Sequence, residues 1–126
     1  MTTTPPEDQH FSSALVDLDL HPDRFAEIPG LRGLRIARIG QYAGKTLEVL
    51  EAAKGVVVPA LTHPSGEIGR VLSGSLRFMQ GGVVRDLKEG DSWHVEAGRA
   101  QGPHVVLQDG TRVAILRDGR SALDVV

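Results

Sequence analysis

Residues 55–108 read GVVVPALTHPSGEIGRVLSGSLRFMQGGVVRDLKEGDSWHVEAGRAQGPHVVLQ. Short apolar runs alternate in this stretch with turns that contain glycine. Near its start His63 and Glu67 stand four residues apart, and near its end Gln101 and His104 flank a Gly-Pro pair. Because short strands separated by tight turns fold into antiparallel sheets, the stretch predicts a small β-barrel with a polar pocket.

The same alternation continues on both sides of this stretch. Turn signals such as Gly81-Gly82 and Asp109-Gly110 favour two-residue hairpins. The strands expected from alternation and turn residues are 11–20, 34–39, 46–52, 56–58, 68–72, 76–79, 83–87, 93–95, 105–107 and 111–116. Residues 23–28 are expected to form one helical turn, 97–103 a loop, and the final residues a last edge strand. About ten short strands at regular spacing, with no long amphipathic helix, predict an all-β fold.

Composition excludes several classes of function. Of the 126 residues 40% are hydrophobic and 24% are charged, with a formal net charge of -2. Without a basic excess, nucleic acid binding is not expected. No apolar run reaches the roughly 20 residues of a membrane helix, and residues 1–10 lack the apolar segment of a signal peptide. Because cysteine is absent, disulfides and thiolate chemistry are excluded, and a cytoplasmic location is expected.

One domain is expected from this length. Residues 1–12 are polar and are expected to form a flexible tail, while residues 13–126 form a single barrel with its core motifs at 55–108. The sequence contains no G-x-G-x-x-G, P-loop or G-x-S-x-G motif, so nucleotide and serine-hydrolase scaffolds are not expected.

One set of residues has a regular spacing, namely Gly55, Leu61, His63, Glu67 and Gly74. This spacing resembles the first motif of the cupin superfamily, Gly-(x5)-His-x-His-(x3,4)-Glu-(x6)-Gly. Gly55, His63, Glu67 and Gly74 stand at four of its positions, and Leu61 stands where the first His is usual. The departure at Leu61 is the main difference from the family pattern.

The second cupin motif, Gly-(x5)-Pro-x-Gly-(x2)-His-(x3)-Asn, is matched less closely. Gly90 opens it, Glu96 replaces the Pro, and Gln101 stands at the His position. If the loop carries three extra residues, His104 takes the His position and Gln108 the Asn position. The resemblance covers about residues 45–117, and both alignments remain open.

The resemblance implies an antiparallel jelly-roll β-barrel, usually dimeric, with a divalent metal held by three His and one Glu inside one end. In this chain the metal ligands would come from His63, Glu67, Gln101 and His104, with His63 and Glu67 as the catalytic pair. Imidazole and carboxylate together suit Fe, Mn, Ni or Zn. The opposite reading is that Leu61 marks the loss of the metal and leaves a plain polar pocket.

The remaining aromatic and basic side chains carry expectations of their own. Trp93 is expected in the core or as a wall of the ligand pocket beside Leu61. His94, between two inward positions, is expected to face outward. Arg70 and Arg77 are expected on the surface, away from the cavity.

Two functions follow from the resemblance. The first is a metal-dependent enzyme of the oxygenase, isomerase or lyase type that acts on a small organic metabolite. The alternative is a non-catalytic cupin that binds or senses a small molecule. In both cases the expected partners are a small-molecule ligand and a second copy of the chain, because short edge strands such as 56–58 need to be covered.

Overall fold

The computed structural model describes residues 24–42, 44–62 and 66–118. Within these ranges it contains strands and no helix. The strands are β1 (Ala26–Ile28), β2 (Leu31–Tyr42), β3 (Lys45–Ala52), β4 (Val57–Val58), β5 (Leu61–Thr62), β6 (Glu67–Ser73), β7 (Ser75–Gln80), β8 (Val83–Lys88), β9 (Ser92–Val95), β10 (Ala100–Gln101), β11 (His104–Val106) and β12 (Thr111–Arg117).

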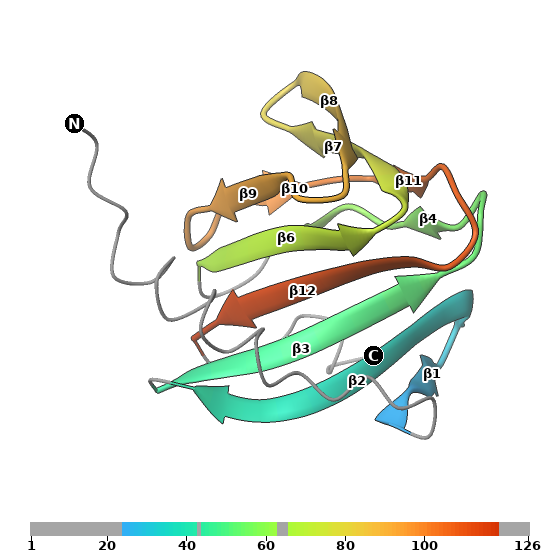
Figure 1. Cartoon of the computed structure of the whole chain (residues 1–126). Helices are drawn as coiled ribbons and strands as arrows, with labels where there is room; N and C mark the ends of the chain where they lie inside the picture. The colour runs from blue at the N-terminus through green and yellow to red at the C-terminus, as the bar shows by residue number, and fades with distance from the viewer. Residues whose placement is uncertain (1–23, 43, 63–65, 119–126) are drawn as a thin grey trace.

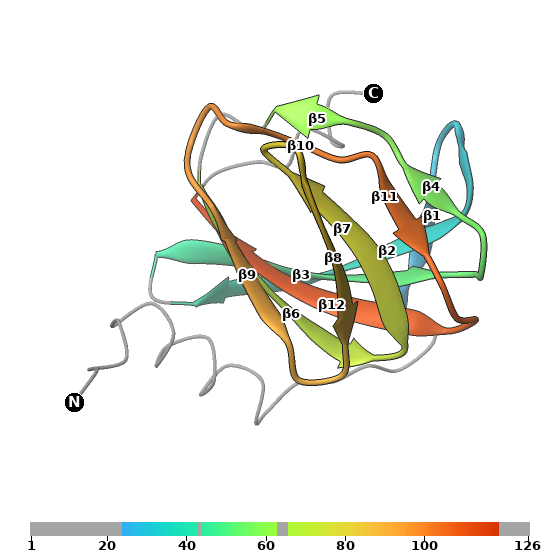
Figure 2. The same cartoon turned by 90° about the horizontal axis from the view of Figure 1, so that it is seen from above.

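The strands form two antiparallel sheets that lie across from each other (Figures 1 and 2). One sheet has the order β1-β2-β3-β12-β6-β9, and the other has the order β4-β11-β7-β10-β5 with β8 paired to β7. Strands distant in sequence are neighbours, since β12 lies between β3 and β6. This arrangement is the expected all-β jelly-roll barrel.

Apolar side chains from both sheets meet in the interior. The main cluster consists of Ile28, Leu34, Ile36, Leu50, Ala52, Val71, Leu76, Phe78, Leu87, Trp93, Val95, Val106, Val113 and Ile115. Because successive side chains of a strand point to opposite faces, the outer face of the first sheet carries a second buried cluster. It consists of Phe25, Ala37, Leu47, Val49, Ala114 and Leu116. The central strands are therefore apolar on both faces, as the imperfect alternation of residues 34–39 indicated.

Most strands expected from the sequence are confirmed within a few residues. The Gly81-Gly82 hairpin joins β7 to β8, and both glycines have positive φ, 58° and 79°. Residues 46–52, for which a helix was the competing interpretation, form β3. Residues 57–58 form the edge strand β4, which pairs with β11 alone among the described strands.

Three expectations differ from the structure or lie outside it. The helical turn at residues 23–28 is wrong for Ala26–Ile28, because these residues pair with β2 and gain ladder hydrogen bonds. The loop at 97–103 contains β10, a strand too short to show alternation. The strand at 11–20, the last edge strand and the tail at 1–12 lie outside the described residues. Among the residues described, no helix is long and apolar enough to cross a membrane.

Gly69 creates the space that Trp93 fills. The two residues are partners in the β6–β9 ladder, and a Cβ built on Gly69 would overlap the six-membered ring of the Trp93 indole. Trp93 is the only tryptophan of the chain and is 5% exposed. The absence of a side chain at position 69 therefore sets the position of the indole.

Gly69→Ala should displace the indole and lower the free energy of unfolding by about 1–3 kcal/mol, the usual cost of overpacking. Urea denaturation followed by Trp93 emission measures both effects. Gly81→Ala serves as the control, because a Cβ there meets no atom within 4 Å. Its effect on stability therefore comes from the positive φ of the backbone alone. An unchanged emission spectrum and unchanged stability for Gly69→Ala would contradict the assignment.

Candidate functional site

Glu67 begins strand β6 and turns its side chain into the barrel. Its ladder partners are Val95 of β9 and Arg117 of β12. Residues directly opposite each other on neighbouring strands present their side chains on the same face, so Glu67 and Arg117 both point inward. Glu67 is 4% exposed and Arg117 is 2% exposed. An acid and a base therefore meet inside a largely apolar core.

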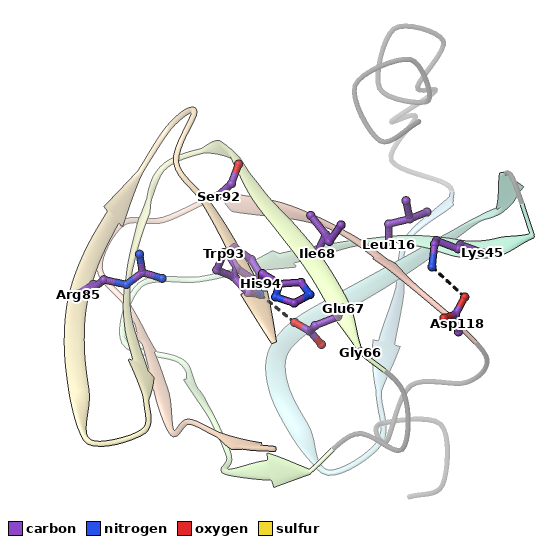
Figure 3. Close-up of a pocket in the computed structure, with 10 residues that line it drawn as sticks. All are labelled: Lys45, Gly66, Glu67, Ile68, Arg85, Ser92, Trp93, His94, Leu116 and Asp118. Carbon is purple, nitrogen blue, oxygen red and sulfur yellow. Dashed lines mark hydrogen bonds and ion pairs between the residues drawn. The ribbon is translucent and has the colours of Figure 1, made fainter. Parts of the chain in front are cut away.

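The carboxylate of Glu67 contacts a donor at each oxygen. Trp93 Nε1 donates a hydrogen bond to Oε2 at 2.8 Å (Figure 3). Arg117 Nη2 lies 3.6 Å from Oε1. The indole N–H orients the carboxylate, and the guanidinium compensates the buried negative charge.

A second carboxylate, that of Glu48, shares the same guanidinium. Glu48 Oε1 lies 3.4 Å from Arg117 Nε, and Oε2 lies 3.9 Å from Arg38 Nε. Burial raises the pKa of Glu48, the charges of Arg117 and Arg38 oppose this rise, and the charge of Glu67 adds to it. Arg117 is thus the buried cation between two acidic side chains.

Gln101 and His104 face the same interior from the opposite sheet. Both are buried, at 6% and 7% exposure. The backbone N–H of Met79 donates to His104 Nδ1 at 3.2 Å, and His104 Nε2 lies 3.2 Å from Gln101 Oε1. Since Nδ1 is an acceptor, the proton of the neutral ring is on Nε2, which donates to Gln101 Oε1.

Aromatic rings connect the two sheets beside these polar groups. The ring of Phe78 stacks on that of His104, with centroids 4.2 Å apart and an angle of 11° between the planes. Its centroid lies 5.0 Å from that of Trp93, at an angle of 37° between the planes. The stack fixes His104 and Trp93 relative to each other, and hence positions both hydrogen-bonded pairs.

Two cavities meet at Glu67 and Trp93. The inner cavity, of about 60 Å³, lies inside the barrel and is also lined by Gln101, His104 and Arg117. The outer pocket, of about 670 Å³, lies at the rim (Figure 3). Its other lining residues are Lys45, Gly66, Ile68, Arg85, Ser92, His94, Leu116 and Asp118. Glu67 and Trp93 line both cavities and form the boundary between them.

Most of the site residues expected from the sequence are found near one another. Glu67, Gln101, His104 and Trp93 all line the inner cavity. The competing alignments of Gln101 and His104 concern two residues that both point inward and bond to each other. His63 lies outside the described residues.

The remaining expectations concern residues around these cavities. The backbone of Leu61 pairs with that of Gln101, while its side chain lies outside the described part of the structure. His94 is exposed, as expected from alternation, and lines the outer pocket. Arg70 donates to Ser92 Oγ and Arg77 pairs with Asp86, away from the inner cavity.

The described residues do not fit the divalent metal that the cupin resemblance implies. A cation near Glu67 would face the guanidinium of Arg117, 3.6 Å from Oε1. His104 Nε2, directed at Gln101 Oε1, carries a proton where a metal needs a lone pair. Among the residues described, no three His, Asp or Glu side chains form a group that could hold a metal. The donors that the structure describes are therefore engaged with one another.

Sequence reasoning missed Glu48 and Arg117. A signal was present in the alternation, because Glu48 shares the inward face of β3 with Leu50, and Arg117 shares that of β12 with Ile115. A charged residue at an inward position predicts a buried partner. The partners lie on different strands, however, and the sequence does not give the β3–β12–β6 order that brings them together.

A family model described as "Cupin domain" matches residues 48–122, which is more than half of the chain. No curated protein matches the sequence.

Several solved structures share the fold. KdgF from Halomonas sp. has 19% identity and a TM-score of 0.71, covering 81% of this chain and 92% of its own. An RmlC-like cupin from Shewanella frigidimarina has 21% identity and a TM-score of 0.71, covering 87% and 96%. The Cnp3 cupin domain from Schizosaccharomyces pombe has 12% identity and a TM-score of 0.64, covering 84% and 72%. At these identities the likeness concerns the fold alone.

Arg117→Met should destabilise the protein strongly. The substitution removes the guanidinium that pairs with Glu48 and Glu67, and both carboxylates stay buried. Removing one partner of a buried pair costs about 3–5 kcal/mol, so chemical denaturation at neutral pH should show a loss of this size. A loss below about 1 kcal/mol, the value for exposed pairs, would contradict this role.

Glu48→Gln should change the pH dependence of stability. Burial raises the pKa of Glu48 above its ordinary value of 4.5, so the folded state binds this proton more tightly than the unfolded state. The resulting stabilisation is present below pH 4.5 and is lost as pH rises through the folded-state pKa. Glu48→Gln lacks this titration, so its stability relative to the natural protein should increase with pH. Denaturation curves from acid to neutral pH measure this; a constant difference would contradict it.

Proposed function

Because the chain belongs to the cupin family, we propose that its rim pocket binds a small organic molecule and that Glu67 is the polar group at the inner end of that site. In this proposal the hydrogen-bonded side chains inside the barrel orient Glu67. The ligand lies in the outer pocket and contacts Trp93 and Glu67 where the two cavities meet.

The observation that carries this proposal is the position of Glu67. Its side chain lines both the outer pocket and the inner cavity, and its carboxylate is oriented by Trp93 at 2.8 Å. A polar group fixed at the inner end of a pocket is typical of small-molecule sites. The outer pocket, of about 670 Å³, falls within the size of roughly 300–1,000 Å³ that such sites have.

The chemistry available at this end of the pocket is that of a carboxylate beside an indole N–H. Glu67 accepts a hydrogen bond from a ligand hydroxyl or amine, and in a catalytic version of the proposal it takes or returns a proton. The guanidinium of Arg117 lies 3.6 Å from Oε1 of the same carboxylate. In this proposal Glu67 either binds the ligand through a hydrogen bond or transfers a proton to and from it without a metal.

A metal-dependent enzyme of the oxygenase, isomerase or lyase type is the second candidate. It is favoured by the position of Glu67, Gln101 and His104 around one inner cavity and by His63 in the family motif. It requires His104 to give up its bond to Gln101 and Glu67 to accept a metal beside Arg117. The existing hydrogen bonds support the metal-free proposal over this candidate.

Metal analysis separates the two candidates. We expect purified protein supplied with Fe, Mn, Ni or Zn and then dialysed to retain far less than one metal per chain, because Glu67 and His104 already have partners. His63→Ala and His104→Ala should then show the same metal content as the natural protein. Near-stoichiometric metal that is lost in both variants would overturn the metal-free proposal and establish the metal-dependent candidate.

Ligand binding is read from the emission of Trp93, the single tryptophan. A panel of small organic acids, sugars and aromatic alcohols should contain compounds that change this emission. Glu67→Gln should weaken their binding about tenfold or more, the loss for a hydrogen bond to a charged group. Glu89→Gln, an exposed change outside the pocket, is the matched control. Equal binding by both variants would remove Glu67 from the site.

The homodimer expected from the sequence stays a prediction. Val57 of the edge strand β4 is 51% exposed, which is consistent with a strand that a second copy covers.

A further inference from the structure

Four charged side chains line the outer pocket, and all of them except Arg85 belong to an ion pair within the described part of the chain. Asp118 Oδ1 pairs with Lys45 Nζ at 3.0 Å, and Glu67 pairs with Arg117. Both acidic groups of the pocket wall are thus compensated by basic groups. Arg85 lines the same pocket and makes no ion pair within the described part of the chain.

Arg85 occupies a position where strand alternation places a core residue. In the β7–β8 ladder it is opposite Phe78, and its Cζ lies 5.9 Å from the centre of the Phe78 ring. Leu87, two residues along β8, is buried in the core. Since residues two apart in a strand share a face, the guanidinium lies on the side of β8 that faces the barrel.

Other groups beside Arg85 complete a polar and aromatic surface. Ser92 Oγ accepts a hydrogen bond from Arg70 Nε at 3.3 Å, so the hydroxyl proton of Ser92 is available to a ligand. In Figure 3, Trp93, His94 and Glu67 lie between Arg85 and the Lys45–Asp118 pair. The pocket therefore has a single uncompensated guanidinium at one end and fixed partners at the other.

We propose that Arg85 makes this pocket selective for small molecules that carry a carboxylate. The inference rests on the proposed function and names the ligand class of that same site. A guanidinium binds a carboxylate through two parallel N–H···O bonds. One uncompensated positive charge matches a carboxylate, whereas a phosphate monoester carries about -1.5 to -2 at neutral pH.

The arrangement on the aromatic rings supports the same role. The guanidinium of Arg85 lies over the ring of Phe78, 5.9 Å from its centre, and this cation–π contact uses none of its N–H donors. Because this contact favours positions of the guanidinium near the ring, it lowers the conformational entropy that is lost when Arg85 binds an anion. The ligand carboxylate binds at Arg85, and the remainder of the molecule extends past Trp93 toward Glu67.

Matched acid and amide pairs test the inference. Benzoate with benzamide and lactate with lactamide are titrated to millimolar concentration, with binding followed by Trp93 emission and by ligand-observed NMR. Each acid should bind at least tenfold more tightly than its amide. Binding of the acids should weaken with added salt, because an exposed charge pair is screened.

Variants at residue 85 separate charge from shape. Arg85→Gln should abolish the preference for the acid, and Arg85→Lys should retain part of it, because lysine keeps the charge but not the planar pair of donors. Arg77→Gln is the matched control, since Arg77 lies on the neighbouring strand, pairs with Asp86 and lines neither cavity. Denaturation curves check that all three variants are folded.

The outcomes distinguish this inference from the proposed function. If amides bind as tightly as acids, or if Arg85→Gln binds the acids as the natural protein does, carboxylate selectivity is wrong while the ligand pocket stands. If no acid and no amide binds, and the broader panel of acids, sugars and alcohols also leaves Trp93 emission unchanged, both the inference and the proposed function fail.

Discussion

The guanidinium of Arg117 is the interaction on which the interior of this barrel depends. It lies 3.4 Å from Glu48 and 3.6 Å from Glu67, both of which are removed from water. A buried carboxylate is costly unless a charge partner and hydrogen bonds compensate it. Arg117 supplies this compensation from the central strand of the sheet, because β12 lies between the strands that carry the two acids. The order of the strands therefore determines which charged side chains meet in the interior of the barrel.

The hydrogen bond that orients Glu67 depends on the absence of a side chain at Gly69. Gly69 leaves room for the indole of Trp93, and the indole donates to Glu67. Phe78 contacts the rings of both Trp93 and His104. These contacts join both sheets. The result is a pair of cavities whose common wall is polar and fixed, although most of the surrounding core is apolar.

The fold could be predicted from the sequence to a large extent, and the site only in part. Strand alternation and glycine turns act over a few residues, so strands such as 46–52 and the hairpin at Gly81-Gly82 were evident. Glu67, Gln101 and His104 were found through the spacing of a family motif. The charge pairs of Arg117 were not, because they depend on residues of neighbouring strands that are some 50 to 70 positions apart in the sequence. The two-residue strands β5 and β10 were missed because two residues cannot show a period.

Strand β8 has a hydrogen-bonded neighbour on one side only within the described structure, namely β7. It nevertheless supplies Arg85 to the wall of the outer pocket. Substitutions at exposed positions of this strand, such as Arg85, change the lining of the pocket, whereas Arg117, Glu48 and Glu67 lie in the other sheet. In evolutionary terms, the exposed positions of β8 are where the lining of this pocket can diverge between related chains without changing Leu87, the buried residue of the strand.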